Sequence, residues 1–389
     1  MTKIAYLATL DRSLYYFRLP WMMELKKRGY RVYALSPREK FFDTLNSLGI
    51  EMIEYKICRG GKNPFYELKI IIDIYKIFKR EKFDLVHTFS HKANIYGALA
   101  AIFAGTPCVI NTMTGLGYIY SNRSAGARIT RTVVSLLYRI CFNFVKKIIF
   151  QNPDDLECFK NVLPDPDRAI VIKSSGVDTG YFKPDNADRV KISALKKELG
   201  VSDSSVTITI IARLLWDKGI RELVSAANIL TQKYPEVVFL IVGWTDKHNP
   251  GMVSAEFVDK IRENPRIKVL GERDDVREVL FLTDIYLFPS YREGTPVTVL
   301  EAMAMEKPII TTDTPGCRQT IENGVNGYLV PVKDTISLVD AAEKLIIDKD
   351  LRVRMGRESR KKVEREFSSN IVIEQVLKLY KELLVSPKG

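Results

Sequence analysis

The sequence predicts an α/β protein made of two doubly wound domains, each with a parallel sheet between two layers of helices. The chain has 389 residues, more than one hydrophobic core usually holds and suited to two domains. Hydrophobic residues make up 46% and charged residues 27%, the balance of a folded globular protein. Short apolar runs alternate with helix-like stretches along the chain, which is typical of parallel strands joined by helices.

The first domain is predicted over residues 1–175, with helices wherever apolar residues recur three and four positions apart. Its strands and helices are predicted, in chain order, at Ile4–Ala8, Pro20–Arg28 (helix), Arg31–Leu35, Glu51–Tyr55, Pro64–Arg80 (helix), Leu85–Thr88, Ala93–Phe103 (helix), Cys108–Thr112, Arg128–Phe144 (helix), Ile148–Phe150 and Ala169–Ile172. Gly176, Gly180, Pro184 and a charged stretch follow, so residues 176–205 are predicted to be a linker.

A second alternating set predicts a second domain over residues 206–368. Its predicted strands are Val206–Ala212, Val237–Val242, Ile267–Leu270, Ile285–Pro289, Pro308–Thr312 and Tyr328–Val330. Two amphipathic helices follow, from about Leu351 to Glu366 and from Asn370 to Leu384. Ligands of doubly wound domains bind at the carboxyl ends of the strands, so we expect a ligand site in a cleft between the two domains.

Several classes of protein are excluded. The N-terminal residues enter a strand-like run at once, which argues against a secretory signal. Apolar runs are broken by charge before they reach the roughly 20 residues that a membrane span needs. Cysteines stand apart, without a C-x-x-C pair, at Cys58, Cys108, Cys141, Cys158 and Cys317. We therefore expect a cytoplasmic protein with reduced cysteines and no zinc module.

Positive charge is concentrated in the first half of the chain. Residues 1–180 carry 27 Lys and Arg against 16 Asp and Glu, whereas residues 181–389 carry 32 against 31. Between Asp84 and Asp154 no acidic residue occurs. The cations of that stretch are Lys92, Arg123, Arg128, Arg131, Arg139, Lys146 and Lys147. This asymmetry favours an anionic partner, either nucleic acid or a membrane surface.

The pattern of the predicted helix at 128–147 favours the membrane. Four cations lie close to one side of it: Arg128, Arg131, Arg139 and Lys146. Its apolar residues lie largely on the other side, so the helix either rests on anionic lipid through its charge, without insertion, or covers its own domain. The stretch lacks the interleaved aromatic and glycine residues of single-strand binders, and no helix-turn-helix or zinc spacing occurs. Nucleic acid is therefore not expected as a partner.

The segment Phe288–Ala302 carries the clearest chemistry. Thr295 is a good N-cap and Pro296 a good first helical residue, so a helix should begin there and offer N–H groups to a phosphate. Glu293 precedes this helix and Glu301 lies within it. A carboxylate can accept hydrogen bonds from two sugar hydroxyls, although two glutamates eight residues apart also occur on solvated helices.

Two cations strengthen the prediction of a ligand site. Arg213 and Lys218 follow the strand Val206–Ala212, at the edge of the sheet where Glu293 is also expected. Two such cations can neutralise a diphosphate. The combination predicts a nucleotide-sugar site lined by Arg213, Lys218, Glu293, Gly294, Thr295, Pro296, Val297 and Glu301.

His91 is a further candidate. It follows the strand Leu85–Thr88 and precedes a helix, so we expect it to touch the sugar, with a helix-cap histidine as the alternative. His87 lies within the apolar strand and is expected in the core. The D-x-D sequence at Asp165–Asp167 is flanked by proline and is typical of a turn. Neither a metal ion nor another cofactor is expected.

The motifs Arg213-x4-Lys218 and Glu293-x7-Glu301 resemble those of the retaining GT-B glycosyltransferases of glycosyltransferase family 4, and the resemblance covers essentially the whole chain. It implies that Arg213 and Lys218 hold the donor diphosphate, Glu301 the ribose and Glu293 the transferred sugar. It also implies that residues 369–389 form a helix that crosses back to the first domain. Many members carry Gly-Gly after the first strand, where this chain has Ala8-Thr-Leu-Asp-Arg-Ser.

Further segments are similar to the branch that adds N-acetylgalactosamine to undecaprenyl-diphosphate-linked diacetylbacillosamine. They include Tyr16-Phe-Arg-Leu-Pro, His91-Lys-Ala-Asn and Thr114-Gly-Leu-Gly. The acceptor and membrane side is accordingly assigned to Arg18, Lys92, Asn94, Gly115, Gly117, Arg128, Arg131, Arg139 and Lys146. The resemblance implies a UDP-sugar donor, a polyprenyl-diphosphate-linked sugar acceptor and a peripheral position on the inner face of the cytoplasmic membrane.

The implied reaction moves a sugar to an acceptor hydroxyl with retention of configuration. Cations and the helix start would stabilise the negative charge that grows on the departing UDP. Retention in the family is usually explained by attack on the same face, with the departing phosphate taking the acceptor proton. Two alternatives stay open: another UDP-hexose or UDP-N-acetylhexosamine transferase of capsule or O-antigen synthesis, and a UDP-sugar epimerase.

Overall fold

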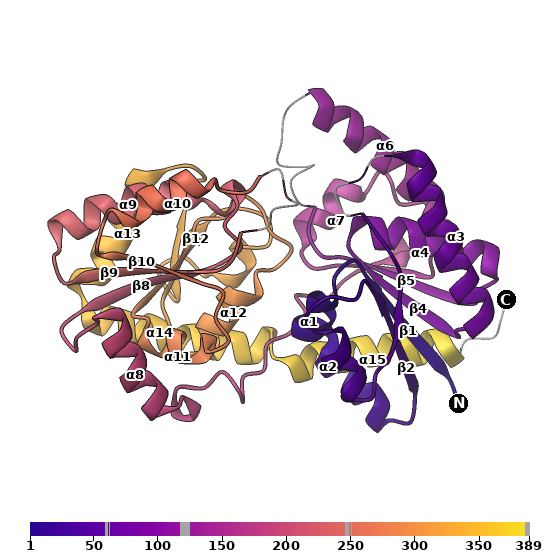
Figure 1. The fold of residues 1–389 in the computed structure, drawn as a ribbon, viewed down its shortest axis with the longest axis horizontal. Helices are drawn as coiled ribbons and strands as arrows, with labels where there is room; N and C mark the ends of the chain where they lie inside the picture. The colour runs from indigo at the N-terminus through magenta and orange to yellow at the C-terminus, as the bar shows by residue number, and fades with distance from the viewer. Residues whose placement is uncertain (59–60, 62, 117–124, 246–248, 250, 386–389) are drawn as a thin grey trace. The chain divides into compact units, whose positions relative to one another are not determined.

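The chain folds into two compact units. A computed structural model describes all residues except 59–60, 62, 117–124, 246–248, 250 and 386–389 (Figure 1). Unit 1 consists of Met1–Gly176 and Ser369–Gly389, and unit 2 of Val177–Ser368. The chain thus passes from unit 1 into unit 2 after Gly176 and returns after Ser368.

Unit 1 contains a sheet of seven parallel strands in the order β3-β2-β1-β4-β5-β6-β7. The strands are β1 (Lys3–Ala8), β2 (Arg31–Ser36), β3 (Glu51–Glu54), β4 (Leu85–Phe89), β5 (Cys108–Met113), β6 (Lys147–Phe150) and β7 (Ala169–Val171). Ile4 of β1 is in register with Val32 on one side and with Leu85 on the other. The order of strands therefore reverses at β1, and a ligand site of this fold is expected between β1 and β4.

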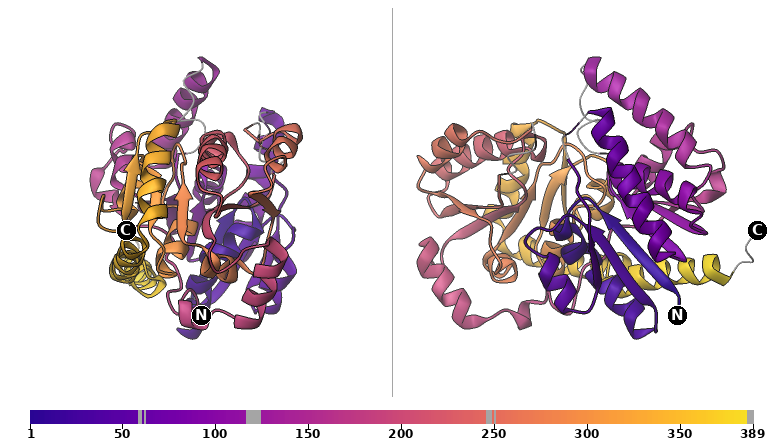
Figure 2. Two further views of the ribbon diagram at one scale, coloured as in Figure 1. Left: turned by 90° about the vertical axis from the view of Figure 1, so that its left-hand side faces the viewer. Right: turned by 45° about the vertical axis from the view of Figure 1, so that its right-hand side comes forward.

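Helices cover both faces of this sheet. One face packs against α1 (Asp11–Lys27), α2 (Phe42–Ser47) and the C-terminal helix α15 (Ser369–Val385). The other packs against α3 (Pro64–Glu81), α4 (His91–Ala104), α6 (Ala125–Cys141) and α7 (Pro153–Phe159). Val372, Val376 and Tyr380 of α15 are buried in the core of unit 1, so the last helix belongs to this unit (Figure 2).

Helix α1 begins nine residues before the predicted start at Pro20, which lies in its interior. Proline lacks the N–H that would bond four residues back, so an internal proline is costly. Leu14, Trp21, Met22 and Leu25 are nevertheless buried at helical spacing along α1. Burial of this stripe offsets the lost hydrogen bond, and the helix continues through the proline.

Unit 2 contains a sheet of six parallel strands in the order β10-β9-β8-β11-β12-β13. The strands are β8 (Val206–Ile211), β9 (Val237–Val242), β10 (Ile267–Gly271), β11 (Ile285–Phe288), β12 (Ile309–Thr312) and β13 (Gly327–Val330). Its helices are α8 (Arg189–Leu199), α9 (Ile220–Lys233), α10 (Ala255–Arg262), α11 (Val276–Leu282), α12 (Val297–Ala304), α13 (Thr335–Ile347) and α14 (Lys349–Glu366). Helices α9 and α13 pack together, as do α12 and α14 (Figure 1).

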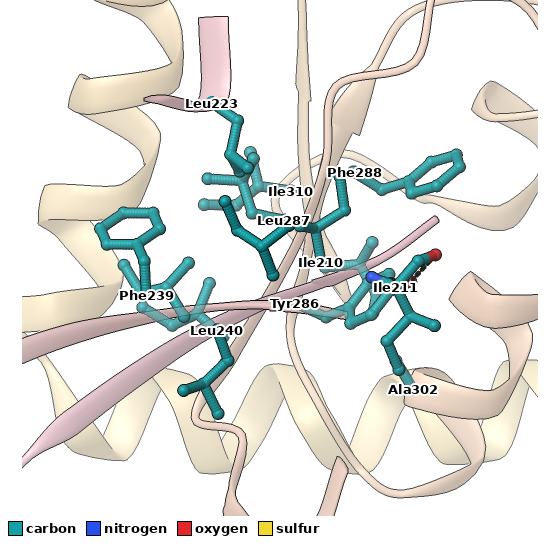
Figure 3. Close-up of a cluster of buried hydrophobic side chains, with 14 of the residues drawn as sticks. Ile210, Ile211, Leu223, Phe239, Leu240, Tyr286, Leu287, Phe288, Ala302 and Ile310 are labelled. Atoms are coloured by element: carbon teal, nitrogen blue, oxygen red, sulfur yellow. Dashed lines mark hydrogen bonds between the residues drawn. The ribbon is translucent and has the colours of Figure 1, made fainter. Parts of the chain in front are cut away.

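The core of unit 2 is built on its two central strands. Ile210 of β8 and Leu287 of β11 are fully buried between the helix layers, and Phe239 and Leu240 of β9 extend the cluster (Figure 3). The hydroxyl of buried Tyr286 donates a hydrogen bond of 3.3 Å to the carbonyl of the last residue of β8. Apolar residues on both sides of each strand are what a parallel sheet covered on both faces requires.

Residues 176–205, which the sequence predicts to be a linker, are largely part of unit 2. The charged stretch within them forms α8, whose N-cap Asp188 accepts hydrogen bonds from Val190 N and Lys191 N. Ile192 and Leu195 of this helix are buried in the core of unit 2. The linker prediction was wrong for this stretch because its many charged residues lie on the exposed side of an amphipathic helix.

The predicted fold class is confirmed. All thirteen predicted strands are present, both sheets are parallel, and helices lie on both faces of each. In the part of the chain that the structure describes, no helix combines the length and apolar character required to cross a bilayer.

Candidate active site

The predicted donor residues lie at the switch point of the sheet in unit 2. Strand β8 lies between β9 and β11, so the order of strands reverses there. Arg213 follows β8 by two residues and Lys218 by seven, while Glu293 follows β11 by five. Because β8 and β11 are parallel neighbours, the loops after them meet at one edge of the sheet.

Lys218 and Glu293 form an ion pair in this place. Lys218 Nζ donates to Glu293 Oε1 over 2.5 Å, and the Ser290 hydroxyl donates to the same oxygen over 2.6 Å. The two charged side chains are only 12% and 17% exposed. The loops are also joined through the backbone, since Tyr291 N donates to Asp217 O over 2.8 Å. The carboxylate of Glu293 is thus held in one orientation by a cation and a hydroxyl.

Two glycines allow the loops to approach this closely. Gly219 has a φ of +70°, and a Cβ there would lie 2.2 Å from the carbonyl oxygen of Pro289. Gly316, in the loop after β12, has a φ of +79°, and a Cβ would lie 2.4 Å from the carbonyl oxygens of both Glu293 and Gly294. Any other residue at either position would force the loops around Glu293 apart.

Helix α12 begins at Val297, one residue later than predicted, with Pro296 as its N-cap. The hydroxyl of Thr295, the predicted N-cap, donates to Gly294 O over 2.9 Å and accepts a hydrogen bond from Gln319 Nε2. The extended backbone of Pro296 lets it precede the first helical residue. The first N–H groups of α12 still lie at the carboxyl edge of the sheet, where a phosphate would meet the positive end of the helix dipole.

Glu301 lies one turn beyond Val297 in α12, partly buried. Burial raises the pKa of its carboxyl to about 8, so the group is largely protonated at neutral pH. A protonated carboxyl both donates and accepts a hydrogen bond, and can therefore pair with neighbouring hydroxyls of a sugar. Glu293 and Glu301 thus lie in different surroundings although both are glutamates of one segment.

His91 is the first residue of α4, at the switch point of unit 1. Its Nε2–H donates to Leu116 O over 3.2 Å, and its Nδ1 accepts from the Tyr138 hydroxyl over 2.9 Å. Burial lowers the pKa of the ring, which favours the neutral form. Both ring nitrogens therefore contact protein groups, one from α6 and one from the loop after β5.

Ser90, the residue before His91, has an unusual backbone conformation at the switch point of unit 1. Ser90 has a φ of +80°, a conformation that residues with a side chain rarely adopt. Its hydroxyl lies 3.3 Å from that of Thr9, which follows β1. The loops after β1 and β4, at the switch point of unit 1, are thus joined by two small hydroxyl side chains.

Three residues assigned to the acceptor side from the sequence make contacts within unit 1. Arg18 is only 3% exposed; its guanidinium lies over the rings of Trp21 and Phe89 and donates to Ser175 Oγ. Asn94 is fully buried and donates to Thr112 O over 3.0 Å.

Lys92 is part of another structural contact. Its Nζ donates to Glu67 Oε1 over 2.7 Å and to the carbonyl oxygens of Cys58 and Gly61. Gly115 follows β5 with a φ of +110°, and Gly117 lies outside the described residues. The sequence alone does not reveal these contacts of Lys92, because their partners come from other segments of the chain.

The basic residues of α6 do reach the surface. Arg128 and Arg139 are exposed, as is Lys146, which lies in the turn after α6 rather than in the predicted helix. Arg128, Arg131, Thr132 and Ser135 line a hollow of about 530 Å³. Guanidinium and hydroxyl groups together suit a phosphate-bearing group.

Two residues near the predicted donor set were missed. Ser290 orients Glu293, and Gln319 holds Thr295 from the loop after β12. Ser290 directly follows an apolar strand, which is a signal for a residue at the ligand edge. Gln319 has no such signal, because its role depends on a strand order that the sequence does not specify.

Comparisons with known proteins identify the family of this chain. The family described as "Glycosyl transferases group 1" matches residues 191–362, and "Glycosyl transferase 4-like" matches residues 3–152. The N,N'-diacetylbacillosaminyl-diphospho-undecaprenol alpha-1,3-N-acetylgalactosaminyltransferase of Campylobacter jejuni is 32% identical over 382 residues, 98% of this chain and 99% of that protein. The UDP-Gal:alpha-D-GlcNAc-diphosphoundecaprenol alpha-1,3-galactosyltransferase of Escherichia coli is 30% identical over 82% of this chain and 81% of its own length.

Solved structures share the fold. A glycosyltransferase from Rickettsia africae matches with a TM-score of 0.79 and 23% identity, over 99% of each chain. Anabaena HepE in complex with UDP and glucose matches with a TM-score of 0.80 and 18% identity, over 98% of this chain and 100% of that one. With its two parallel-sheet domains of the GT-B type, this chain belongs to the group 1 glycosyltransferases.

Proposed function

We propose that this protein transfers N-acetylgalactosamine from UDP-GalNAc to undecaprenyl-diphosphate-linked diacetylbacillosamine, with retention of configuration. The name of the Campylobacter relative, which aligns with 98% of this chain, supports this donor and this acceptor. The observation that carries the proposal is the Lys218–Glu293 pair beside the start of α12, at the switch point of unit 2. It supports the proposal because a joined cation and carboxylate near a helix N-terminus suit a nucleotide sugar.

The donor diphosphate is bound by positive groups. Arg213 and Lys218 contact its oxygens, and the N–H groups that begin α12 meet the phosphate from the other side. Gly294, Thr295, Pro296 and Val297 form the turn that brings these N–H groups to the donor. No resident metal ion or cofactor is part of this proposal; the UDP-sugar is a substrate.

Donor binding rearranges the ion pair. Lys218 is bonded to Glu293, and a donor diphosphate, with its greater charge, competes for the same ammonium group. Glu293 then turns its carboxylate to the hydroxyls of the transferred sugar while Ser290 keeps hold of it. The ion pair between Lys218 and Glu293 thus holds the lysine in place until the donor diphosphate binds it.

Glu301 contacts the ribose. Its raised pKa keeps the carboxyl protonated near neutral pH, so it can donate to one ribose hydroxyl and accept from the next. The absence of a negative charge there also avoids repulsion of the nearby diphosphate. One glutamate is therefore suited to the nucleoside and the other to the sugar.

The reaction exchanges one bond at the anomeric carbon for another. The C1–O bond to the β-phosphate breaks, its electron pair stays on UDP, and the acceptor oxygen forms the new C1–O bond on the same face of the sugar. The acceptor proton passes to the departing phosphate. Arg213, Lys218 and α12 lie where the negative charge grows, so their stabilisation increases towards the transition state.

The acceptor is bound by unit 1 at an anionic membrane surface. Arg128, Arg131, Arg139 and Lys146 attract that surface, and the hollow beside Arg128 and Arg131 suits the phosphate groups of the lipid-linked sugar. His91 acts as a positioning residue, since it joins α4 to Tyr138 of α6 and to the loop after β5. Because its acceptor is lipid-linked, the protein would work as a peripheral protein on the cytoplasmic face of the membrane.

A related transferase of capsule or O-antigen synthesis is the second candidate. The Escherichia coli relative is a galactosyltransferase that acts on an N-acetylglucosamine carried by diphosphoundecaprenol, which favours another UDP-hexose as donor and another lipid-linked sugar as acceptor. Both candidates share the lipid diphosphate and the UDP group.

A panel of donors separates the candidates. UDP-GalNAc, UDP-GlcNAc, UDP-Gal, UDP-Glc and a GDP-sugar are each incubated with lipid-linked diacetylbacillosamine, and the glycolipid products are separated and weighed by mass spectrometry. We expect product from UDP-GalNAc at a rate well above the others. Efficient transfer from UDP-Gal or UDP-Glc alone would replace the proposed donor by the second candidate.

A further inference from the structure

The side chain of Tyr291 joins two segments at the edge of the unit 2 sheet that carries the predicted donor residues. Tyr291 follows β11 by three residues, and its hydroxyl donates to the carboxyl group of Glu222, 2.9 Å from each carboxyl oxygen. Glu222 lies in the first turn of α9 and is 7% exposed. A carboxyl group in such a buried position needs hydrogen-bond partners, and this hydroxyl supplies one. The bond therefore fastens the loop after β11 to the start of α9.

The same two segments meet at a second point. Tyr291 N donates to Asp217 O over 2.8 Å, and the Ser290 hydroxyl donates to the same carbonyl oxygen over 3.2 Å. Lys218 directly follows Asp217, and Glu293 lies two residues after Tyr291. The ion pair between Lys218 and Glu293 therefore lies beside hydrogen bonds that join the two segments from which it comes.

The ring of Tyr291 has a contact of its own. Lys333, in the loop after β13, places its Nζ 5.1 Å from the centre of the ring. A cation over an aromatic face is attracted by the negative charge of the π system. Ring and hydroxyl thus contact different groups, so replacement of Tyr291 by Phe removes the bond to Glu222 and keeps the ring beside Lys333.

The position of Glu293 depends on how this loop is held. Glu293 N donates to Pro315 O over 3.2 Å, which joins the loop to the one after β12. Towards α9, the loop is bonded to Asp217 and Glu222. The bond to Glu222 is made between two side chains, so a substitution can remove it without a change in the backbone. A shift of about 1 Å in a group that contacts the reacting atoms can slow a reaction about a hundredfold.

We propose that Tyr291 is a positioning residue for the transfer reaction, with Glu222 as its anchor. Their hydrogen bond fixes the loop after β11 against α9, so that Glu293 meets the transferred sugar while Lys218 binds the diphosphate. The inference rests on the proposed function for these roles of Glu293 and Lys218. Tyr291 and Glu222 act on the reaction through Glu293 and not through contact with the donor.

Four variants isolate the hydrogen bond. Tyr291→Phe removes the donating hydroxyl, and Glu222→Ala removes the accepting group. Glu222→Gln keeps a carbonyl oxygen that can accept the same bond. The fourth variant combines Tyr291→Phe with Glu222→Ala. For each protein, kcat is measured with the donor and acceptor that give product with the parent, and affinity for UDP is measured by calorimetry.

The expected result is a loss of kcat without a loss of UDP affinity. We expect kcat to fall at least about tenfold in Tyr291→Phe and in Glu222→Ala, because Glu293 is no longer held in its productive position. UDP affinity should stay close to that of the parent, since Arg213, Lys218 and Glu301 are unchanged. Glu222→Gln should keep most of the parental kcat. The double variant should lose no more than the larger single loss, because both substitutions remove one bond.

Thr283→Val is the matched control for a general loss of stability. Thr283 lies before β11, at the opposite end of the strand from Glu293, and is 2% exposed. Its hydroxyl is bonded to Thr209 Oγ1 over 2.7 Å and to Val279 O over 2.9 Å. Loss of this buried hydroxyl should lower the Tm, as in Tyr291→Phe, and leave kcat at the parental level.

Hydrogen exchange reads the position of the loop without any substrate. Exchange of backbone amides is measured on peptides that cover residues 289–295, in the absence of nucleotide sugar. We expect faster exchange in Tyr291→Phe and Glu222→Ala than in the parent, and parental exchange in Glu222→Gln and Thr283→Val. Failure of the proposed transfer reaction would leave this measurement unchanged, so the two failures can be distinguished.

Each of four results would overturn the proposal. The first is a parental kcat in Tyr291→Phe, and the second is an equal fall of kcat in Thr283→Val. The third is a loss of UDP affinity in parallel with kcat, which would assign Tyr291 to the donor site itself. The fourth is parental exchange of residues 289–295 in Tyr291→Phe.

Discussion

Glu293 and Glu301 are glutamates of one segment that lie in different surroundings. Glu293 is bonded to a cation and a hydroxyl, whereas burial raises the pKa of Glu301 to about 8. Sequence spacing locates both glutamates and the two cations, because residue types that follow strands reveal the ligand edge. It does not reveal Gln319 or the partners of His91 and Arg18, since these depend on side chains brought together from distant elements.

Arg213→Ala should lower turnover at least about a hundredfold, the scale of losing one preorganised group that stabilises developing charge. Arg213 lies in a partly buried loop outside the core, so thermal stability should change little. Steady-state transfer and thermal unfolding of the same preparation check both halves. Near-normal turnover would remove Arg213 from the donor site.

The two glutamates should fail differently. Glu301→Gln should weaken binding of UDP itself, since its partner is the ribose, whereas Glu293→Gln should leave UDP affinity nearly intact and slow transfer. Calorimetry with UDP, followed by transfer assays, makes the comparison. Equal losses of UDP affinity in the two variants would contradict the assigned roles.

The raised pKa of Glu301 also predicts a pH dependence of stability. Between pH 4.5, the ordinary pKa of this group, and about 8, the folded protein holds the proton and the unfolded chain does not. The contribution of the group to stability is therefore complete below pH 4.5 and is lost as pH rises through about 8. Glu301→Gln has no proton to lose, so the Tm of the parent should fall relative to that of the variant between pH 5 and pH 8.5. A constant difference in Tm across this range would exclude the titration.

At the scale of elements, the helices were harder to predict than the strands. Apolar strand runs are unambiguous because both faces of each sheet are covered. Helix α1 passes through Pro20 because its buried stripe offsets the lost hydrogen bond, and α8 was hidden by its charge.

Charge reversal on α6 should remove the electrostatic part of membrane binding. Arg128, Arg131, Arg139 and Lys146 each contribute about 1 kcal/mol near an anionic surface, so replacing all four with Glu should abolish sedimentation with anionic vesicles at physiological salt. Transfer to the natural lipid-linked acceptor should slow, while transfer to a short soluble analogue should persist. Parent-like vesicle binding of this variant would show that these cations do not face lipid.

At the scale of the whole molecule, alternation of strands and helices is enough to predict two doubly wound units, because parallel strands require covering helices between them. The return of the chain to unit 1 as α15 is not a consequence of that alternation. It depends on Val372, Val376 and Tyr380 finding an apolar face on unit 1, where the Tyr380 hydroxyl lies 2.5 Å from Nδ1 of buried His87.

Turnover should survive removal of divalent cations, since Arg213, Lys218 and α12 are proposed to stabilise the departing diphosphate. Transfer is measured after dialysis against EDTA, with and without added Mg²⁺ or Mn²⁺. Complete loss that either cation restores would overturn this part of the proposal.

The product of one reaction tests the central claim most directly. The protein is incubated with UDP-GalNAc, in which the sugar is α-linked, and lipid-linked diacetylbacillosamine, and the anomeric configuration of the product is measured by nuclear magnetic resonance. The account predicts a glycolipid one N-acetylgalactosamine longer, with an α-linkage. A β-linked product, free N-acetylgalactosamine, or conversion of the donor to UDP-GlcNAc without transfer would contradict it.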